Sequence, residues 1–191
     1  MKNGLVILGL MAIFWSCGSS EKAATSASRI EDQILENLVT KKSFQIESEM
    51  AQPSTNNAMN SVANSRLFLP GNSGSNINLT GNPNYLKVKG DTVSAYLPYF
   101  GVQQVTAGYG TGSAIEFNGI PDNWKSRRNA KKNSYEVTFT IRRDTEVFQV
   151  SLTMYPNLTS HMHINSAQRN FIKYLGKVSE LPEENVNEEG L

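Results

Sequence analysis

The first periodic pattern along the chain is helical. Four apolar residues fall at i, i+4, i+5 and i+8, on one face of a helix: Ile30, Ile34, Leu35 and Leu38. Ser28, with Glu31 three residues later, matches a capping box. The pattern therefore predicts one helix over about residues 28 to 41, docked on the domain through its apolar stripe.

From Phe44 onward the period changes to two, which is typical of half-buried strands. The alternation is clearest at 135–141 and 148–154, which flank a turn at 142–145. Residues 51–84 are rich in Asn, Ser, Gly and Pro and predict loops with one or two weak edge strands. The remaining strands are expected at 44–50, 85–88, 92–97, 103–109, 113–117, 160–166 and 170–176.

About eight short strands with hardly any helix between them indicate a mainly β, antiparallel fold. Consecutive hairpins without long crossovers favour a meander barrel, because a closed barrel leaves no exposed strand edge. The expected domain is helix plus barrel over residues 28–178. Residues 179–191 carry five glutamates and predict an acidic, disordered tail.

The amino-acid composition excludes some classes of function but does not identify one. The chain has 191 residues, which suits one domain, and 18 basic against 17 acidic side chains. This balance gives no indication of nucleic-acid binding. The only cysteine, Cys17, excludes an internal disulfide.

The N-terminus has the pattern of a bacterial lipoprotein signal over residues 1–16. Lys2 precedes an apolar run at 5–15 that is too short to span a bilayer, and small residues flank Cys17. We expect Cys17 to receive the lipid and residues 17–27 to form a flexible tether. Phe14 and Trp15 are bulkier than usual for such a site, so an ordinary cleaved signal or an unprocessed anchor stays the alternative.

Five sequence motifs resemble a known family. They are VKGDTV, YLPYFG, AIEF, FQVSLTMYPN and FIKYLGKV, within residues 40–178. They resemble the Bacteroidetes envelope lipoproteins that carry domain of unknown function 4251. The resemblance implies a lipocalin-like barrel and a location in the cell envelope, and it implies no catalytic residues.

The YLPYFG motif also has a physical interpretation. Pro98 should end its strand and Gly101 should let the backbone turn. Tyr96, Tyr99 and Phe100 would then close the core at one barrel end. The alternative makes these aromatic residues the floor of a ligand site.

The sequence gives little support for a catalytic site or a metal site. His161 and His163 lie on one face of a strand, a spacing that two zinc ligands could use, but no third ligand is identifiable. No G-x-S-x-G motif accompanies a serine, so a hydrolase triad has no basis. We therefore predict no catalytic residue, no metal and no cofactor.

Two surface features offer further hypotheses. Residues 125–132 hold five basic side chains and predict a solvated loop, with contact to anionic lipid headgroups or a glycan as the alternative: Lys125, Arg127, Arg128, Lys131 and Lys132. Thr92 follows Asp91 and precedes Val93, which resembles the O-glycosylation sequence of exported Bacteroidetes proteins.

The leading hypothesis is a non-enzymatic envelope lipoprotein whose barrel binds a small amphipathic ligand or a partner protein. The alternative is a structural accessory of an envelope complex, with a filled barrel and no ligand. Small inward-facing side chains would favour the former and bulky ones the latter. Only Glu21 is acidic between Cys17 and Glu31, so the periplasmic face of the outer membrane is favoured over the cell surface.

Overall fold

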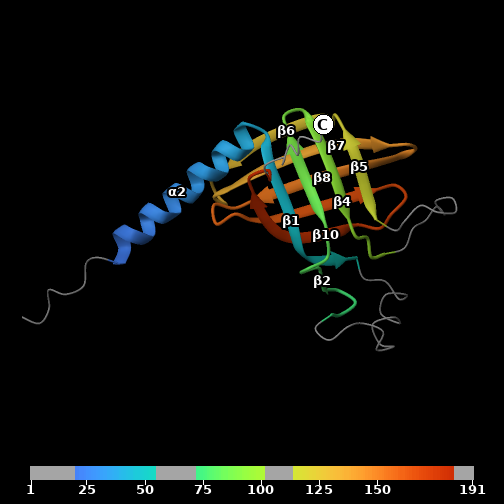
Figure 1. Ribbon diagram of the computed structural model, residues 1–191, viewed down its shortest axis with the longest axis horizontal. Helices are drawn as coiled ribbons and strands as arrows, with labels where there is room; N and C mark the ends of the chain where they lie inside the picture. The colour runs from blue at the N-terminus through green and yellow to red at the C-terminus, as the bar shows by residue number, and fades with distance from the viewer. Residues whose placement is uncertain (1–19, 55–71, 102–113, 183–191) are drawn as a thin grey trace, which may run out of the picture.

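The computed structural model describes residues 20–54, 72–101 and 114–182, in which one helix precedes a series of strands (Figure 1). The elements are α2 (Ser20–Thr40), β1 (Ser43–Pro53), β2 (Ile77–Asn78), β3 (Tyr85–Lys89), β4 (Thr92–Leu97), β5 (Ile115–Gly119), β6 (Asp122–Asn129), β7 (Ser134–Arg143), β8 (Glu146–Met154), β9 (Thr159–Ser166) and β10 (Ile172–Ser179). Residues 55–71 of the predicted loop segment, the expected strand at 103–109 and the tail beyond residue 182 lie outside the described residues.

The strands form one antiparallel sheet that curls into a half-barrel. Its hydrogen-bonded order is β5-β4-β3-β1-β10-β9-β8-β7-β6, and the short β2 pairs with β1. Neighbours in the sheet are neighbours in the chain, apart from the pairing of β1 with β10 and with β3. This architecture confirms a mainly β fold and is roughly consistent with the predicted lipocalin-like barrel.

Among the described strands, the sheet ends in two edges, and no backbone pairing between these two strands closes it. Strands β5 and β6 end the hydrogen-bonded path, although only Ile120 and Pro121 separate them in the chain. Arg143 of β7 reaches the outer edge of β5, where its Nη1 donates to the backbone oxygen of Glu116 at 3.2 Å. This contact satisfies an edge carbonyl and leaves one less acceptor for an incoming strand.

Residues 122–129 form strand β6, where the sequence predicted a basic loop. Lys125 pairs with Thr138 of β7, and the pairing continues to the end of the strand after an irregularity between Asp122 and Lys125. Trp124 stacks on Phe139 of β7 with ring centroids 5.4 Å apart. This aromatic packing and the backbone pairing outweigh the low strand propensity of a charged segment, because propensity is a weak guide once tertiary contacts form.

Helix α2 begins at Ser20, so the predicted start at Ser28 is wrong and residues 20–27 are helical instead of a flexible tether. Ala23, Ala24 and Ala27 are strong helix formers and let the helix extend beyond the capping box. Leu35, Leu38 and Val39 are buried, whereas Ile30 is 57% exposed and Ile34 is also exposed. The docking surface is therefore restricted to the C-terminal turns of the helix, and the N-terminal half points away from the strands (Figure 1).

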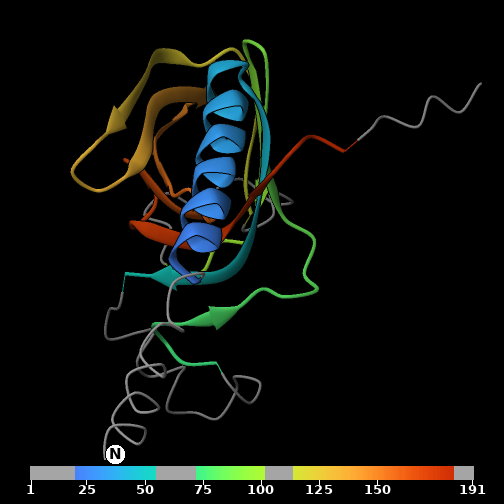
Figure 2. The same cartoon turned by 90° about the vertical axis from the view of Figure 1, so that its left-hand side faces the viewer.

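Contacts from α2 place the helix across one end of the curled sheet. Asp32 accepts a hydrogen bond from Arg128 of β6 at 2.6 Å, and the helix also contacts β1. Figure 2 shows α2 in front of the sheet, with strands on both sides of it. The helix thus closes the end of the half-barrel at which β1 begins.

The inward positions of the sheet are filled by large apolar side chains. The largest fully buried side chains come from the strands, with Leu35 from α2 and Leu79 from the segment after β2: Tyr174, Phe44, Phe148, Leu35, Ile46, Leu79, Leu86, Leu97, Ile115, Leu152, Met154 and Met162. They form one contiguous cluster with the other buried apolar residues. Among the described residues, bulky inward side chains are the rule, which is the arrangement expected of a filled barrel.

A β-bulge interrupts β1 between Ser48 and Met50. On the other side of β1, where its pairing with β3 ends at Ile46 and Leu86, the buried side-chain amide of Asn84 binds the backbone of Ser48. Its Oδ1 accepts from the Ser48 backbone nitrogen at 2.8 Å, and its Nδ2 donates to the Ser48 oxygen at 2.9 Å. One side chain thus supplies both backbone partners of Ser48 just beyond the end of the β1–β3 pairing.

Replacing Asn84 by Ala is expected to lower the free energy of unfolding by about 2 kcal/mol, because it leaves buried backbone groups of Ser48 without partners. Urea unfolding measures the change. The matched control is Asn82→Ala, since the Asn82 side chain is exposed and the change there should stay within about 0.5 kcal/mol. Equal unfolding midpoints for the two variants would contradict the role assigned to Asn84.

Candidate functional site

The Pro98–Gly101 segment closes the end of the half-barrel opposite α2. Tyr99 is buried, and its hydroxyl donates to the backbone oxygen of Asn170 at 3.1 Å. Tyr174 of β10 donates its hydroxyl to the Pro98 oxygen at 2.8 Å. These two bonds tie the segment to the β9–β10 connection, so Tyr99 lies where the core-packing interpretation placed it.

The other residues of the motif divide between core and surface. Phe100 packs partly buried against the core. Tyr96 is 40% exposed on the outer face of β4, so the expectation that it closes the core is wrong. Strand alternation explains this, because Tyr96 lies one position before the buried Leu97. A Cβ atom on Gly101 would lie 2.5 Å from the Tyr99 hydroxyl oxygen, so the buried tyrosine requires a glycine there.

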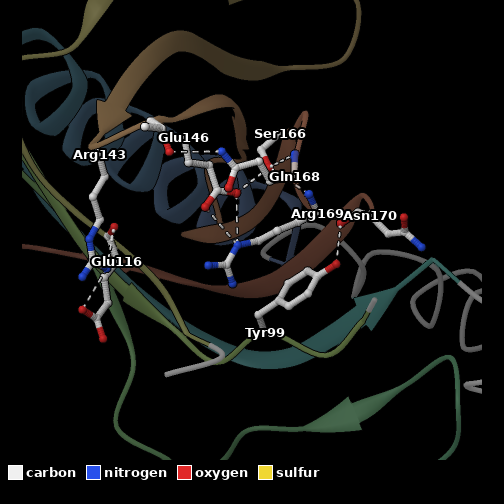
Figure 3. A network of polar contacts seen from close by, with 9 residues as sticks. Tyr99, Glu116, Arg143, Glu146, Ser166, Gln168, Arg169 and Asn170 are labelled. Atoms are coloured by element: carbon white, nitrogen blue, oxygen red, sulfur yellow. Dashed lines mark hydrogen bonds and ion pairs between the residues drawn. The ribbon is translucent and has the colours of Figure 1, made fainter. Parts of the chain in front are cut away.

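A buried ion pair lies beside Tyr99 (Figure 3). Arg169 Nε donates to both carboxylate oxygens of Glu146, at 3.1 and 3.2 Å, and the two side chains are only 9% and 12% exposed. The guanidinium also lies over the Tyr99 ring, 5.2 Å from its centroid. Ser166 donates to Glu146 at 2.6 Å and accepts from the backbone nitrogen of Arg169 at 3.1 Å.

The protonation of this network is set by burial. Desolvation raises the pKa of Tyr99 and raises that of Tyr174 far above its usual range. Both phenols therefore stay neutral at physiological pH and use their protons in hydrogen bonds to carbonyl oxygens. The arrangement therefore stabilises this end of the core and leaves neither hydroxyl available for acid–base chemistry.

The basic residues of segment 125–132 do not form one patch. Arg128 points to the helix side, where it binds Asp32 and lies over the Tyr135 ring. Arg127 pairs with Glu136 of β7 on the outer face. Lys131 and Lys132 are exposed in the turn after β6, and Lys125 is exposed on the outer face. The ion pairs neutralise two of the five charges, which leaves three lysines in two separate places.

Thr92 is exposed at the start of β4, directly after the turn at Gly90. Its neighbour Asp91 binds Lys42 Nζ at 2.8 Å. The hydroxyl is therefore accessible at a hairpin end, the position where a glycan could be attached without disturbing the core. Cys17, the predicted lipid attachment residue, lies outside the described residues.

His161 and His163 both lie on the outer face of β9. The His161 ring contacts Tyr155 edge-on at 5.3 Å, and the His163 ring is tilted against Phe171 at 5.4 Å. Partial burial and the neighbouring Lys173 lower the pKa of both histidines, so both are neutral at pH 7. Within residues 20–54, 72–101 and 114–182, no group of three or more potential metal ligands comes together.

The outer face of β6–β9 carries a groove of about 400 Å³ that the sequence did not predict. We call it the outer groove. Its lining is Asn123, Lys125, Thr138, Phe139, Thr140, Gln149, Val150, Ser151, His163, Asn165 and Phe171. The signal available in the sequence is the set of polar residues that alternate with the core residues of each strand. Without strand β6, however, the groove lacks one wall, and the sequence predicted a loop there.

Two further pockets lie on the surface. One, of about 550 Å³, covers the outer face of β3–β5 and includes Tyr85, Tyr96 and the Glu116–Arg143 pair. The other, of about 380 Å³, lies between α2 and the residues after β10. In the described part of the chain, no helix is both long and apolar enough to cross a membrane.

A sequence profile of the family described as "Domain of unknown function (DUF4251)" matches residues 27–178, which is more than half of the chain. The match begins within α2 and ends near the end of β10. No curated protein is significantly similar in sequence to this chain.

Proposed function

The chain belongs to the DUF4251 family, and from this premise we propose that it is a lipid-anchored protein of the bacterial envelope that binds ligands on the outside of a filled barrel. The family description names no activity. The proposal therefore depends on the side chains of this chain and on its N-terminal sequence. In this proposal the barrel is a rigid scaffold, and ligands bind on its outer surface.

The filled interior is the observation that carries the proposal. Inward positions of the described strands hold residues such as Phe44, Phe148 and Tyr174, packed in one cluster. A small amphipathic ligand would need to displace several of these side chains, and each displacement would cost a large part of the stability of the domain. The outer groove offers a volume of about 400 Å³ without any such cost.

The absence of catalysis is part of the proposal. The buried polar cluster around Glu146 and Arg169 is occupied by internal hydrogen bonds. The raised pKa of Tyr99 and Tyr174 moves both phenols away from the range useful for acid–base chemistry at neutral pH. These features support a binding module over an enzyme.

The filled interior also favours a second candidate, a structural accessory of an envelope complex that binds no ligand. Both candidates include the lipid anchor, but only the first binds a ligand in the outer groove. A fluorescent apolar probe such as N-phenyl-1-naphthylamine should show no saturable binding under either. Saturable binding of one probe per chain that Phe171→Ala leaves unchanged would contradict both candidates, because it would indicate an apolar cavity in the barrel.

The anchor is proposed from Lys2, the apolar run at 5–15 and the small residues beside Cys17. Helix α2 begins three residues after Cys17. The C-terminal turns of this 21-residue helix pack on the sheet, so only its N-terminal half would act as a stalk that holds the domain away from the bilayer. The scarcity of acidic residues after Cys17 favours the periplasmic face of the outer membrane.

Metabolic labelling with a palmitate analogue tests the anchor. The natural chain should be labelled and recovered with the outer membrane, and Cys17→Ala should be unlabelled because the chain has no other cysteine. Equal labelling of the two chains would contradict the proposal. Ser19→Ala, two residues away, is the matched control and should be labelled like the natural chain.

A further inference from the structure

We infer that the outer groove binds a saccharide chain and that Lys125 at its rim gives it a preference for sugars that carry a carboxylate. This inference rests on the proposed function, because it names the ligand class of the outer surface. Four features of the groove carry it: the regular spacing of its polar side chains, their lack of internal partners, one exposed aromatic ring and the sign of the charge.

The polar side chains lie in two rows across neighbouring strands. In the first row, Lys125 lies opposite Thr138, Thr138 opposite Ser151, and Ser151 opposite His163. In the second row, Thr140 lies opposite Gln149, and Gln149 opposite Asn165. Neighbouring strands are about 4.8 Å apart, so each row presents a polar group at regular short intervals, as a chain of hydroxyl-bearing rings requires.

Most of these side chains have no partner in the protein. Of the groove residues in the described part of the chain, Thr140 and Asn123 hydrogen-bond with each other at 3.2 Å. The donors and acceptors of Gln149, Ser151 and Asn165 are left for a ligand or water. An amide offers two donors and two acceptor positions, and a hydroxyl offers one donor and two, which matches the mixed hydrogen bonding of sugar hydroxyls.

The row next to the groove provides a contrast on the same sheet face. There Arg127 and Glu136 form an ion pair, and Glu136 also accepts from Asn129 at 2.9 Å. These side chains satisfy one another. The side chains of this row therefore bind one another, whereas most of those in the two rows of the groove do not.

An exposed aromatic ring lies at the β10 side of the groove. Phe171 is 42% exposed, although it is a large apolar residue. The His163 ring contacts one side of its ring. The apolar C–H face of a sugar ring can stack on such a side chain and cover it from water. Exposure of Phe171 is otherwise unfavourable, since burying a side chain of this kind is worth about 2 kcal/mol.

The charge of the groove narrows the ligand class. Its lining includes one lysine and no carboxylate, so it does not suit a cationic ligand. His163 is neutral at pH 7, which leaves too little positive charge for a polyphosphate or a nucleic acid. Lys125 at the β6 side and Lys173, opposite His163 at the β10 side, flank the neutral centre. A saccharide with a carboxylate fits this distribution.

Isothermal titration calorimetry tests the inference. The full-length chain is held in a zwitterionic detergent, because a detergent with a sugar headgroup would compete for the groove. The probes are α-1,4-linked tetragalacturonic acid and the neutral tetragalactose of the same linkage. Both should bind with one-site saturation, the acidic probe more tightly. Failure of both to bind at millimolar concentration would overturn the inference.

Three variants make the test specific. Asn165→Ala and Phe171→Ala should each weaken both probes about tenfold. Lys125→Ala should weaken the acidic probe alone. The matched control is Asn118→Ala, which removes an equally exposed strand amide on β5, outside the groove, and should bind like the natural chain. Unchanged affinity in Asn165→Ala would overturn the inference, and unchanged urea unfolding midpoints verify that the variants are folded.

A vesicle assay separates the saccharide from a membrane surface. Binding to phosphatidylglycerol vesicles that depends on Lys125, together with no binding of either sugar, would assign the groove to lipid headgroups and overturn the inference. The calorimetry is repeated on Cys17→Ala, which should bind both probes normally. Loss of palmitate labelling therefore bears only on the anchor, and loss of sugar binding bears only on the groove.

Discussion

Gly176→Ala is expected to destabilise the protein by about 3 kcal/mol, at the upper end of the cost of overpacking a core. The added Cβ would overlap the backbone oxygen of Glu47 and would lie 2.7 Å from the Ser48 Cα. Both atoms belong to the bulged part of β1, whose backbone Asn84 holds in place. A backbone atom has no rotamer to change, so β1 and β10 would need to separate where the sheet joins its first and last strands.

Gly119→Ala is the matched control for this change. It also replaces a strand glycine, but no atom lies within 4 Å of the added Cβ. Its free energy of unfolding should stay within about 0.5 kcal/mol of that of the natural chain. Urea unfolding followed by tryptophan fluorescence measures both variants. If Gly176→Ala and Gly119→Ala unfold at the same urea concentration, the close approach of β1 and β10 is wrong.

Glu146→Gln is expected to cost about 3 kcal/mol, because it removes the charge that balances a buried guanidinium and keeps the shape of the side chain. Arg169 donates Nε to both oxygens of this carboxylate. Ser166 donates to the same group and in turn holds the backbone of residues 168 and 169. The change should therefore loosen the end of the half-barrel that Tyr99 closes.

The exposed pair of Arg143 and Glu116 is the control for the buried one (Figure 3). Its ions lie 3.0 Å apart, but both side chains are exposed to water, which screens their attraction. Glu116→Gln should cost less than about 1 kcal/mol in thermal or urea unfolding. If Glu146→Gln and Glu116→Gln lower the free energy of unfolding equally, burial does not determine how much the Glu146 ion pair stabilises the protein.

Strand alternation made much of the fold predictable. The alternation at Tyr135, Val137 and Phe139 continues across the turn into β8, and the structure pairs these strands as expected. Strand β6 was not predictable in this way, because four charged residues among its eight dominate its local pattern. Its one inward anchor, Trp124, is recognisable only when Phe139 of the neighbouring strand lies beneath it.

The candidate site was likewise predictable only where a local sequence pattern defines it. Tyr99 could be assigned to the core from the YLPYFG motif, since a proline ends the strand and a glycine permits the turn. Its partners, Arg169 and Asn170, lie about 70 residues further along the chain and no local pattern connects them to it. The outer groove depends on register across four strands, and register is a property of the folded sheet.

The sequence by itself determined most of the strands, the family and the features from which the Cys17 anchor is proposed, because each depends on a local pattern of a few residues. Only the tertiary structure decided that the described strands end in two edges, that bulky side chains fill the inner face of the sheet and that polar side chains line a groove on its outer face. The physical reason is that closure, packing and register depend on contacts between residues far apart in the chain, whose free energies no single segment contains.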